Sequence, residues 1–297
     1  MRGLKTQSPA GTTGLLFGLL LAIAAQAARL PNMTSYLQGE VNEVALLTAQ
    51  SNYLQQQGDP LGAALVASYI PDHQVMIRQW STFIQQNGGN PSMVQPIMTP
   101  VQGTREQILR YDEQAHQQAI DSYRRLARST SNPTIRGLAA LGEGGATRHF
   151  NSLEVANSVS TWSTLRLADA TMAALALERA AINDLQVQAN QLTALGDPTT
   201  ANLVMSMIPQ HQQQAANLQA LLVQLGGNPN RIILPPTVVL GSRTDILSHL
   251  AITNTQFVNT YAIAINALPP GPLQQVMAQG QSLALTALAS LQQLPVA

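Results

Sequence analysis

The sequence contains no cysteine, and its single lysine is Lys5. Without cysteine the chain can form no disulfide, no thiolate metal site and no thiol nucleophile. A lone lysine near the N-terminus excludes a lysine Schiff base, a phosphate-loop lysine or a lysine general base in the body of the protein. These two absences remove thiol and lysine chemistry from the candidate functions.

Aromatic residues and net charge are scarce as well. Phe, Trp and Tyr make up 4% of the 297 residues, too few for a platform on which bases or sugars could stack. Fifteen basic and 15 acidic residues give a formal net charge of zero, so no overall charge attracts nucleic acid or an anionic membrane. We therefore expect no nucleic-acid partner.

Residues 1–28 have the pattern of an export signal. Arg2 and Lys5 precede an apolar run that ends in Ala25-Gln26-Ala27, which fits the small-x-small pattern of a cleavage site. The stretch 11–28 is also nearly long enough to span a bilayer as an uncleaved anchor, so a second alternative is attachment to the inner membrane. Both alternatives place the rest of the chain in the periplasm or outside the cell.

The rest of the chain is a tandem duplication. Ile70-Pro71-Asp72-His73-Gln74 returns 138 residues later as Ile208-Pro209-Gln210-His211-Gln212, and the same offset pairs Gly58-Asp59-Pro60 with Gly196-Asp197-Pro198. Such a period is far too long for a solenoid repeat. The sequence therefore predicts two domains, residues 33–157 and 164–295.

Each copy predicts four helices, because apolar residues recur at helical spacing. In the first copy the predicted helices cover 33–57, 60–86, 104–128 and 133–155, and the second copy follows the same plan. Pro71 is expected to kink the second helix or loosen the turn before it. Thr104-Arg105-Glu106-Gln107 is a capping-box pattern that marks the start of the third. The predicted fold class is all-α, with two four-helix bundles in tandem.

A carboxylate and an imidazole recur at one spacing in both copies. Glu40 lies 33 residues before His73, and Glu178 lies 33 residues before His211. One interpretation is a metal site, and the other is a structural histidine that hydrogen-bonds the first helix or caps a carbonyl freed by the proline. Both interpretations remain open at this point.

The first copy has further candidate ligands on its other helices. His116 and His149 can converge with Glu40 and His73, and Met76 lies one turn from His73. Imidazole with carboxylate suits Cu(II), Zn or Fe, and a methionine would favour Cu(I). The second copy lacks histidines at the positions equivalent to His116 and His149, so Glu178 and His211 are expected to form a degenerate copy.

These spacings resemble those of ferritin-like four-helix proteins, in which one helix gives a Glu and the next a Glu-x-x-His to a metal inside the bundle. The resemblance implies two ferritin-like bundles. His73 and His211 occupy the position of the Glu in that motif. Met76 and Gln214 occupy the position of its His. Because neither copy keeps Glu-x-x-His, a di-iron oxidase is not expected.

A nearer resemblance is to two exported bacterial families of ferritin-like domains, labelled DUF4142 and DUF305. His73, His116 and His149 are similar in placement to histidines of the first family. Met207-Ile208-Pro209-Gln210-His211-Gln212 is similar to the Met-Ile-Pro-His-His-Gln run of the second, some members of which are associated with copper. The resemblance implies a copper ion as the candidate cofactor and no established common enzymatic activity.

The last two predicted helices have an unusual composition, because no Asp, Glu, Lys or Arg follows Asp245. Solvated helices normally carry charge, so this stretch favours packing between the bundles or docking on another extracytoplasmic or membrane protein. The sequence therefore predicts a non-enzymatic binding or structural protein, an accessory subunit of a membrane or cell-surface assembly, with no catalytic residue. The alternative is a periplasmic copper-binding protein that uses the histidines of the first bundle.

Overall fold

The computed structural model describes residues 33–97, 100–158 and 164–294. All regular structure in these ranges is helical, and none of it is strand. The predicted all-α fold class is therefore confirmed for this part of the chain. The proposed export signal and anchor, residues 1–28, lie outside it. Among the helices that are described, none has both the length and the apolar character needed to cross a bilayer.

The helix bounds follow the sequence-based expectation closely. The first copy forms α2 (Met33–Gln56), α3 (Pro60–Ala67), α4 (Ile70–Gln86), α5 (Arg105–Ser129) and α6 (Pro133–Ser158), with a 3-10 turn η1 (Pro91–Met93). The second copy forms α7 (Thr164–Ala194), α8 (Pro198–Gln224), α9 (Arg243–Ala267) and α10 (Pro272–Gln292), with η2 (Pro229–Arg231).

Local signals explain where the helices begin. The side chains of Asp59 and Asp197 accept hydrogen bonds from backbone N–H groups in the first turns of α3 and α8. Thr104 and Gln107 form the predicted capping box at the start of α5. Gly58 and Gly196 precede the two aspartates with φ of +78° and +82°, a conformation that glycine adopts without strain.

The two equivalent prolines have different effects. The turn before Pro71 is loosened, as expected, but to the point that the single helix predicted over 60–86 is two helices. At Pro71 the chain breaks into α3 and α4, with Ser68 and Tyr69 between them. Pro209 lies exposed inside the continuous helix α8. The difference has a tertiary cause, because side chains of α9 reach the first break and donate to backbone oxygens beside it.

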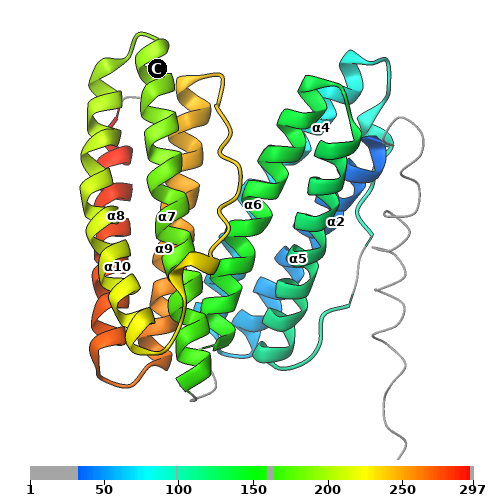
Figure 1. The fold of residues 1–297 in the computed structure, drawn as a ribbon. Helices are drawn as coiled ribbons and strands as arrows, with labels where there is room; N and C mark the ends of the chain where they lie inside the picture. Colours follow the sequence, from blue (N-terminus) through cyan, green and yellow to red (C-terminus); the bar gives the residue numbers. More distant parts are fainter. Residues whose placement is uncertain (1–32, 98–99, 159–163, 295–297) are drawn as a thin grey trace, which may run out of the picture.

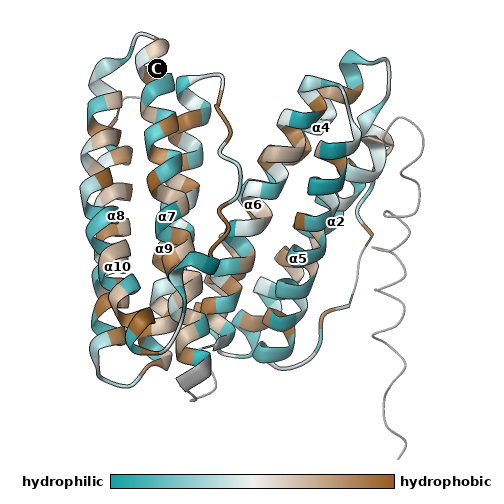
Figure 2. Ribbon diagram, in the orientation of Figure 1, coloured by the Kyte–Doolittle hydropathy of each residue, from teal (hydrophilic) through white to brown (hydrophobic). Residues whose placement is uncertain are grey.

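The helices form two groups that stand side by side (Figure 1). Helices α2 to α6 make one group and α7 to α10 the other, and α6 contacts both α7 and α9. The segment between η2 and α9 runs as an extended connection along the boundary, as the long crossover predicted from the sequence requires. Hydrophilic residues occupy much of the outward side of α5 (Figure 2).

A continuous apolar core joins the two groups. Leu47, Leu65 and Leu153 of the first copy belong to the same buried cluster as Leu177 and Phe257 of the second. Two smaller clusters lie within single groups, one around Trp80 and the other around Val204 in α8. The boundary between the copies is therefore a packed interface.

Candidate metal centre

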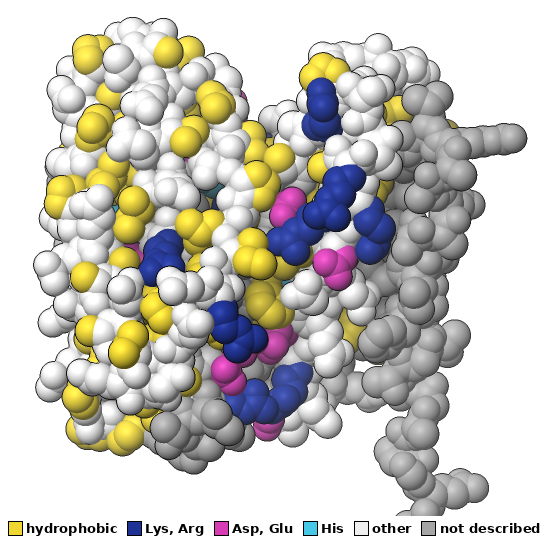
Figure 3. Space-filling view, viewed as in Figure 1, with side chains coloured by type: hydrophobic (Ala, Val, Ile, Leu, Met, Phe, Trp, Pro, Cys, Tyr) yellow, Lys and Arg dark blue, Asp and Glu magenta, His cyan; other side chains and the backbone are white. Residues whose placement is uncertain are grey.

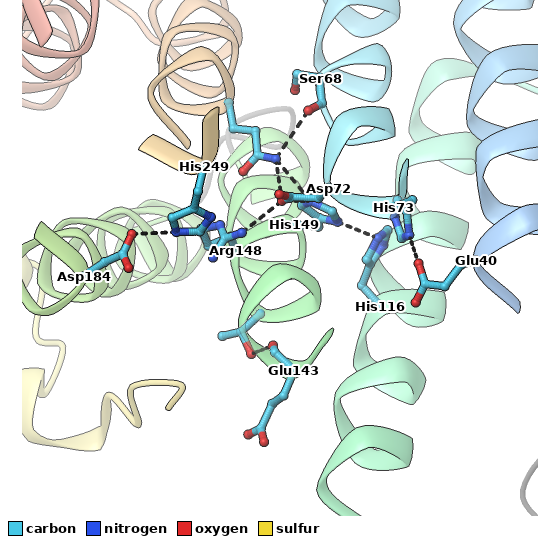
Figure 4. A network of polar contacts seen from close by, with 12 residues as sticks. Glu40, Ser68, Asp72, His73, His116, Glu143, Arg148, His149, Asp184 and His249 are labelled. Atoms are coloured by element: carbon cyan, nitrogen blue, oxygen red, sulfur yellow. Dashed lines mark hydrogen bonds and ion pairs between the residues drawn. The ribbon is translucent and has the colours of Figure 1, made fainter. Parts of the chain in front are cut away.

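Three histidines from three helices meet inside the first group (Figure 4). One ring nitrogen each from His73 of α4, His116 of α5 and His149 of α6 lies within 4.8 Å of the other two. His116 Nε2 and His149 Nδ1 are 3.0 Å apart. His116 and His149 are buried, and the side chain of His73 is 12% exposed. The structure thus brings together the three histidines that the sequence singled out.

The outer nitrogen of each ring is held by an oxygen atom. His73 Nδ1 lies 2.7 Å from Glu40 Oε2, and His116 Nδ1 lies 2.7 Å from the backbone oxygen of Asp112. His149 Nε2 lies 3.0 Å from Asp72 Oδ2. A carboxylate or carbonyl on the far nitrogen fixes the orientation of a histidine and directs its other nitrogen inward, as metal-ligating histidines require.

The protons on His149 cannot satisfy both of its neighbours. The carbonyl of Asp112 only accepts, so His116 Nδ1 carries a proton and neutral His116 offers a lone pair at Nε2. His149 then faces this lone pair on one side and the Asp72 carboxylate on the other. A neutral ring has one N–H. A proton on Nε2 leaves two lone pairs facing each other between His149 and His116. A proton on Nδ1 leaves Nε2 as an acceptor beside Asp72 Oδ2, where Gln256 Nε2 at 3.2 Å can donate to it.

Protonation of His149 does not resolve this conflict at neutral pH. Burial lowers its pKa to about 4, although Asp72 favours the charged form. Burial also lowers the pKa of His116 well below its usual range, and the neighbouring His149 and His73 add to the effect. Both rings are therefore neutral, and two lone pairs point at each other when His149 donates to Asp72.

The pKa of His73 is raised, whereas those of the other two histidines are lowered. Burial opposes its charged form, but the carboxylates of Glu40, Glu43 and Asp72 outweigh burial and raise its pKa to about 9. Its Nε2 is buried and has no hydrogen-bond partner among the described residues. A metal ion at this nitrogen would displace a proton.

Asp72 is the negative end of the network. Its Oδ2 accepts from Arg148 Nη2 at 3.0 Å and from Gln256 Nε2 at 2.9 Å, in addition to His149. Burial alone would raise the pKa of Asp72, but Arg148 and His149 hold it well below the ordinary range. Gln256 lies on α9 and also donates to the backbone oxygen of Ser68 at 3.3 Å. The second copy thus contributes a hydrogen bond to the histidine network of the first.

Two buried carboxyl groups lie on the other side of His73. Gln50 Nε2 donates to Asp112 Oδ1 at 2.7 Å, while Asp112 Oδ2 and Glu43 Oε1 are buried without a partner among the described residues. Burial raises the pKa of both acids, and Glu43 raises that of Asp112 further. Burial thus disfavours the ionised forms of both acids, and a cation nearby would favour them.

Glu40 holds His73 and has no free oxygen for a metal. Its Oε2 faces His73, and Tyr123 of α5 donates its hydroxyl to Oε1. The second copy repeats the arrangement, with His211 Nδ1 2.6 Å from Glu178 Oε2 and the hydroxyl of Tyr261 on Glu178 Oε1. We call this unit the Glu-His-Tyr module.

The remaining predicted ligands lie outside the cluster of three nitrogens. Met76 is buried in the apolar cluster around Trp80. In the second copy Asn254 occupies the position equivalent to His116, and its side chain donates to the backbone of its own helix. The equivalent of the histidine cluster is therefore missing around His211. The described residues contain one group of three possible metal-binding side chains.

The sequence-based prediction missed Asp72, Tyr123 and Gln256. Asp72 had a visible signal, since it adjoins His73 and the second copy has Gln210 in its place. Tyr123 and Tyr261 are also related by the 138-residue offset, which marks them as part of a repeated unit. Gln256 is likewise paired with Gln118 by this offset, but its contact with Asp72 could not be read from the repeat, because it depends on how the two groups of helices pack.

A comparison of the chain with family models, with curated proteins and with solved structures finds no match in any of the three.

Proposed function

We propose that the first copy binds a transition-metal ion through His73, His116 and His149. The observation that carries this proposal is that each ring has its outer nitrogen on a carboxylate or carbonyl oxygen while its inner nitrogen faces the other two. A cation between the inner nitrogens removes the contact between two lone pairs at 3.0 Å.

The donor set indicates the class of metal. Imidazole nitrogens suit copper, zinc, nickel and iron, and there is no thiolate to select a softer ion. Met76 belongs to the apolar core, so the favoured copper state is Cu(II) rather than Cu(I). We therefore propose a divalent ion, copper or zinc, bound by three imidazoles and supported by Glu40 and Asp72.

Metal analysis of matched variants tests the proposal. The purified full-length protein is stripped with chelator, titrated with Cu(II) and with Zn(II), and analysed by native mass spectrometry. His73→Ala removes a proposed ligand, and His211→Ala makes the same change in the Glu-His-Tyr module that lacks a histidine cluster. Both variants leave a buried glutamate without its histidine, so their folding costs are comparable.

The expected result is one metal ion per chain in the unmodified protein and in His211→Ala. Affinity in His73→Ala should fall by more than the roughly 10- to 100-fold that loss of an outer-shell partner costs. Equal affinity in the two variants, or no bound metal in either the native or the reloaded protein, would overturn the proposal.

We further infer that residues 33–157 and 164–295 are two tandem ferritin-like bundles, exported to the periplasm by residues 1–28. The repeated Glu-His-Tyr module supports common descent of the two copies. The mass of the N-terminus of the native protein distinguishes a cleaved signal from a retained inner-membrane anchor, and an intact N-terminus in the cytoplasmic fraction would contradict export.

A second candidate function is docking of the second copy on another extracytoplasmic or membrane protein. Most of the strongly exposed large apolar side chains described belong to this copy: Leu195, Met205, Val223, Ile233, Val239 and Leu285. Figure 3 shows apolar side chains scattered over this group of helices and few charged ones. Size-exclusion chromatography of native membrane extracts tests it, and a strictly monomeric species without a partner would contradict it.

A further inference from the structure

A cleft of about 320 Å³ opens between the two groups of helices. It lies between α4 and α6 on one side and the connection 238–241 with the start of α9 on the other. The face drawn in Figure 3 is hollowed between the two groups. A volume of this size falls at the lower end of the range of small-molecule sites.

The lining of the cleft combines apolar and polar side chains. The walls include Val75, Leu138, Leu141, Val238, Leu240 and Ile252. His73, His149 and Arg148 also line the cleft, so it adjoins the histidine network. A predominantly apolar cavity with a few convergent polar groups is the usual form of a ligand site.

The acidic groups that line the cleft already have partners. Glu40 accepts from His73 and Tyr123, and Asp72 accepts from Arg148, His149 and Gln256. The third acid, Asp245, accepts from the hydroxyl of Ser242. These carboxylates therefore offer little to a ligand.

Two arginines are the positively charged groups of the cleft that could hold an anion. Arg148 uses Nη2 on Asp72, but its Nε is buried without an acceptor among the described residues. Arg78 is exposed on α4, and no ion pair or hydrogen bond of its side chain occurs in the described part of the chain. The exposed guanidinium of Arg78 is open to acceptor oxygens of a ligand, and a negative charge on the ligand strengthens that contact.

We propose that the cleft binds a small organic anion, with a carboxylate group on the arginine side and a compact apolar body against the walls. The site is separate from the three inner histidine nitrogens and does not require a bound metal. Arg148 and Arg78 determine the charge of the ligand, and the space beside Gly137 determines its size.

Gly137 provides a way to fill the cleft without disturbing the histidines. It lines the cleft on α6, and a Cβ at this position meets no atom within 4 Å. A leucine there projects into open space. Gly39 on α2 is the matched control, because a Cβ there also meets no atom within 4 Å and the residue does not line the cleft.

The test is a calorimetric titration of the metal-free full-length protein with hexanoate and with 1-hexanol, which has the same chain but no charge. We expect one hexanoate per chain and at least about tenfold weaker binding of the alcohol. Gly137→Leu should weaken hexanoate binding by at least about tenfold, Gly39→Leu should leave it unchanged, and Arg78→Met should reduce the preference for hexanoate over hexanol.

Three outcomes would overturn the proposal: no binding of hexanoate, equal binding of the acid and the alcohol, or equal binding by the Gly137→Leu and Gly39→Leu variants. Because the protein is metal-free in this experiment, the outcome is independent of the metal titration. A protein that binds metal but no hexanoate would contradict this inference alone.

Discussion

At the scale of single residues, the Glu-His-Tyr module explains a glycine in the middle of a helix. A Cβ at Gly142 of α6 would lie closer than van der Waals contact to the ring of Tyr123, and a Cβ at Gly280 of α10 would meet Tyr261 in the same way. Each tyrosine is held by its hydrogen bond to a buried glutamate. Gly142 therefore makes room for the ring at a cost in helix propensity.

We predict that Gly142→Ala destabilises the protein by about 1–3 kcal/mol, because the added methyl group overpacks against Tyr123. The control is Gly137→Ala in the same helix, where the methyl group meets open space and improved helix propensity should stabilise by about 0.5–1 kcal/mol. Urea unfolding followed by circular dichroism measures both. A change of the same sign in the free energy of unfolding of the two variants would contradict the prediction.

Glu154 on α6 makes stability depend on pH near neutrality. Burial, together with a hydrogen bond and the charge of Glu113, raises its pKa from 4.5 to about 7, and Asp169 adds a further negative charge. Between these two values the folded chain retains a proton that the unfolded chain has released. The contribution of Glu154 to folding stability therefore falls as the pH rises through this window.

We predict that Glu154→Gln removes this pH dependence. Relative to the unmodified protein, the free energy of unfolding of the variant should increase as the pH rises from about 5 to about 8. Urea unfolding at a series of pH values measures the difference. A difference that is constant over this range would show that Glu154 titrates alike in the folded and unfolded chains.

At the scale of helices, the break between α3 and α4 is where the second copy reaches the first. Gln256 and Asn259 lie on α9, and their side chains donate to the backbone oxygens of Ser68 and Ala64. Gln256 is fully buried and also contacts Asp72. One side chain of the second copy thus supports both the helix break and the carboxylate that holds His149.

We predict that Gln256→Leu weakens metal binding by roughly 10- to 100-fold, the usual cost of losing an outer-shell partner. Asn259→Leu is the control, because it removes a similar contact between the copies without touching Asp72. Metal titration gives the affinities, and unfolding gives the stabilities. Equal losses of affinity in both variants would assign the effect to packing between the copies and contradict a specific role for Gln256.

At the scale of the whole molecule, the two copies share one buried cluster, so neither has a complete core of its own. Leu65 and Leu153 pack in the same cluster as Leu177 and Phe257. Separation of the copies would expose this apolar surface to water. We therefore expect the two copies to behave as a single cooperative body.

We predict that thermal unfolding is a single transition, in which the calorimetric and van't Hoff enthalpies agree. Hydrogen exchange should give core amides of α5 and of α8 similar opening free energies, since both groups lose the shared cluster together. Two resolved transitions, or much slower exchange in one group than in the other, would contradict this prediction.

Much of the secondary structure could be predicted from the sequence, because its signals act over a few residues. The capping box at Thr104 and the Gly58-Asp59-Pro60 turn marked helix ends correctly. A loosened turn before Pro71 was expected from the proline, but the division into two helices could not be predicted, since the identical residue pair at Pro209 lies within a continuous helix. What differs is the presence of α9 side chains next to the first proline.

In the candidate site, too, some residues could be predicted from the sequence and others could not. Histidine spacing and the comparison of the two copies indicated His73, His116 and His149, because residues on adjacent helices of a bundle meet when they share a level. The sequence by itself determined the helices, the duplication and these three imidazoles. The tertiary structure decided that Glu40 contacts His73, that Gln256 donates to Asp72 from 184 residues away, and that a cleft adjoins the histidine cluster. These features depend on the packing of helices that are distant in the chain, which no local pattern encodes.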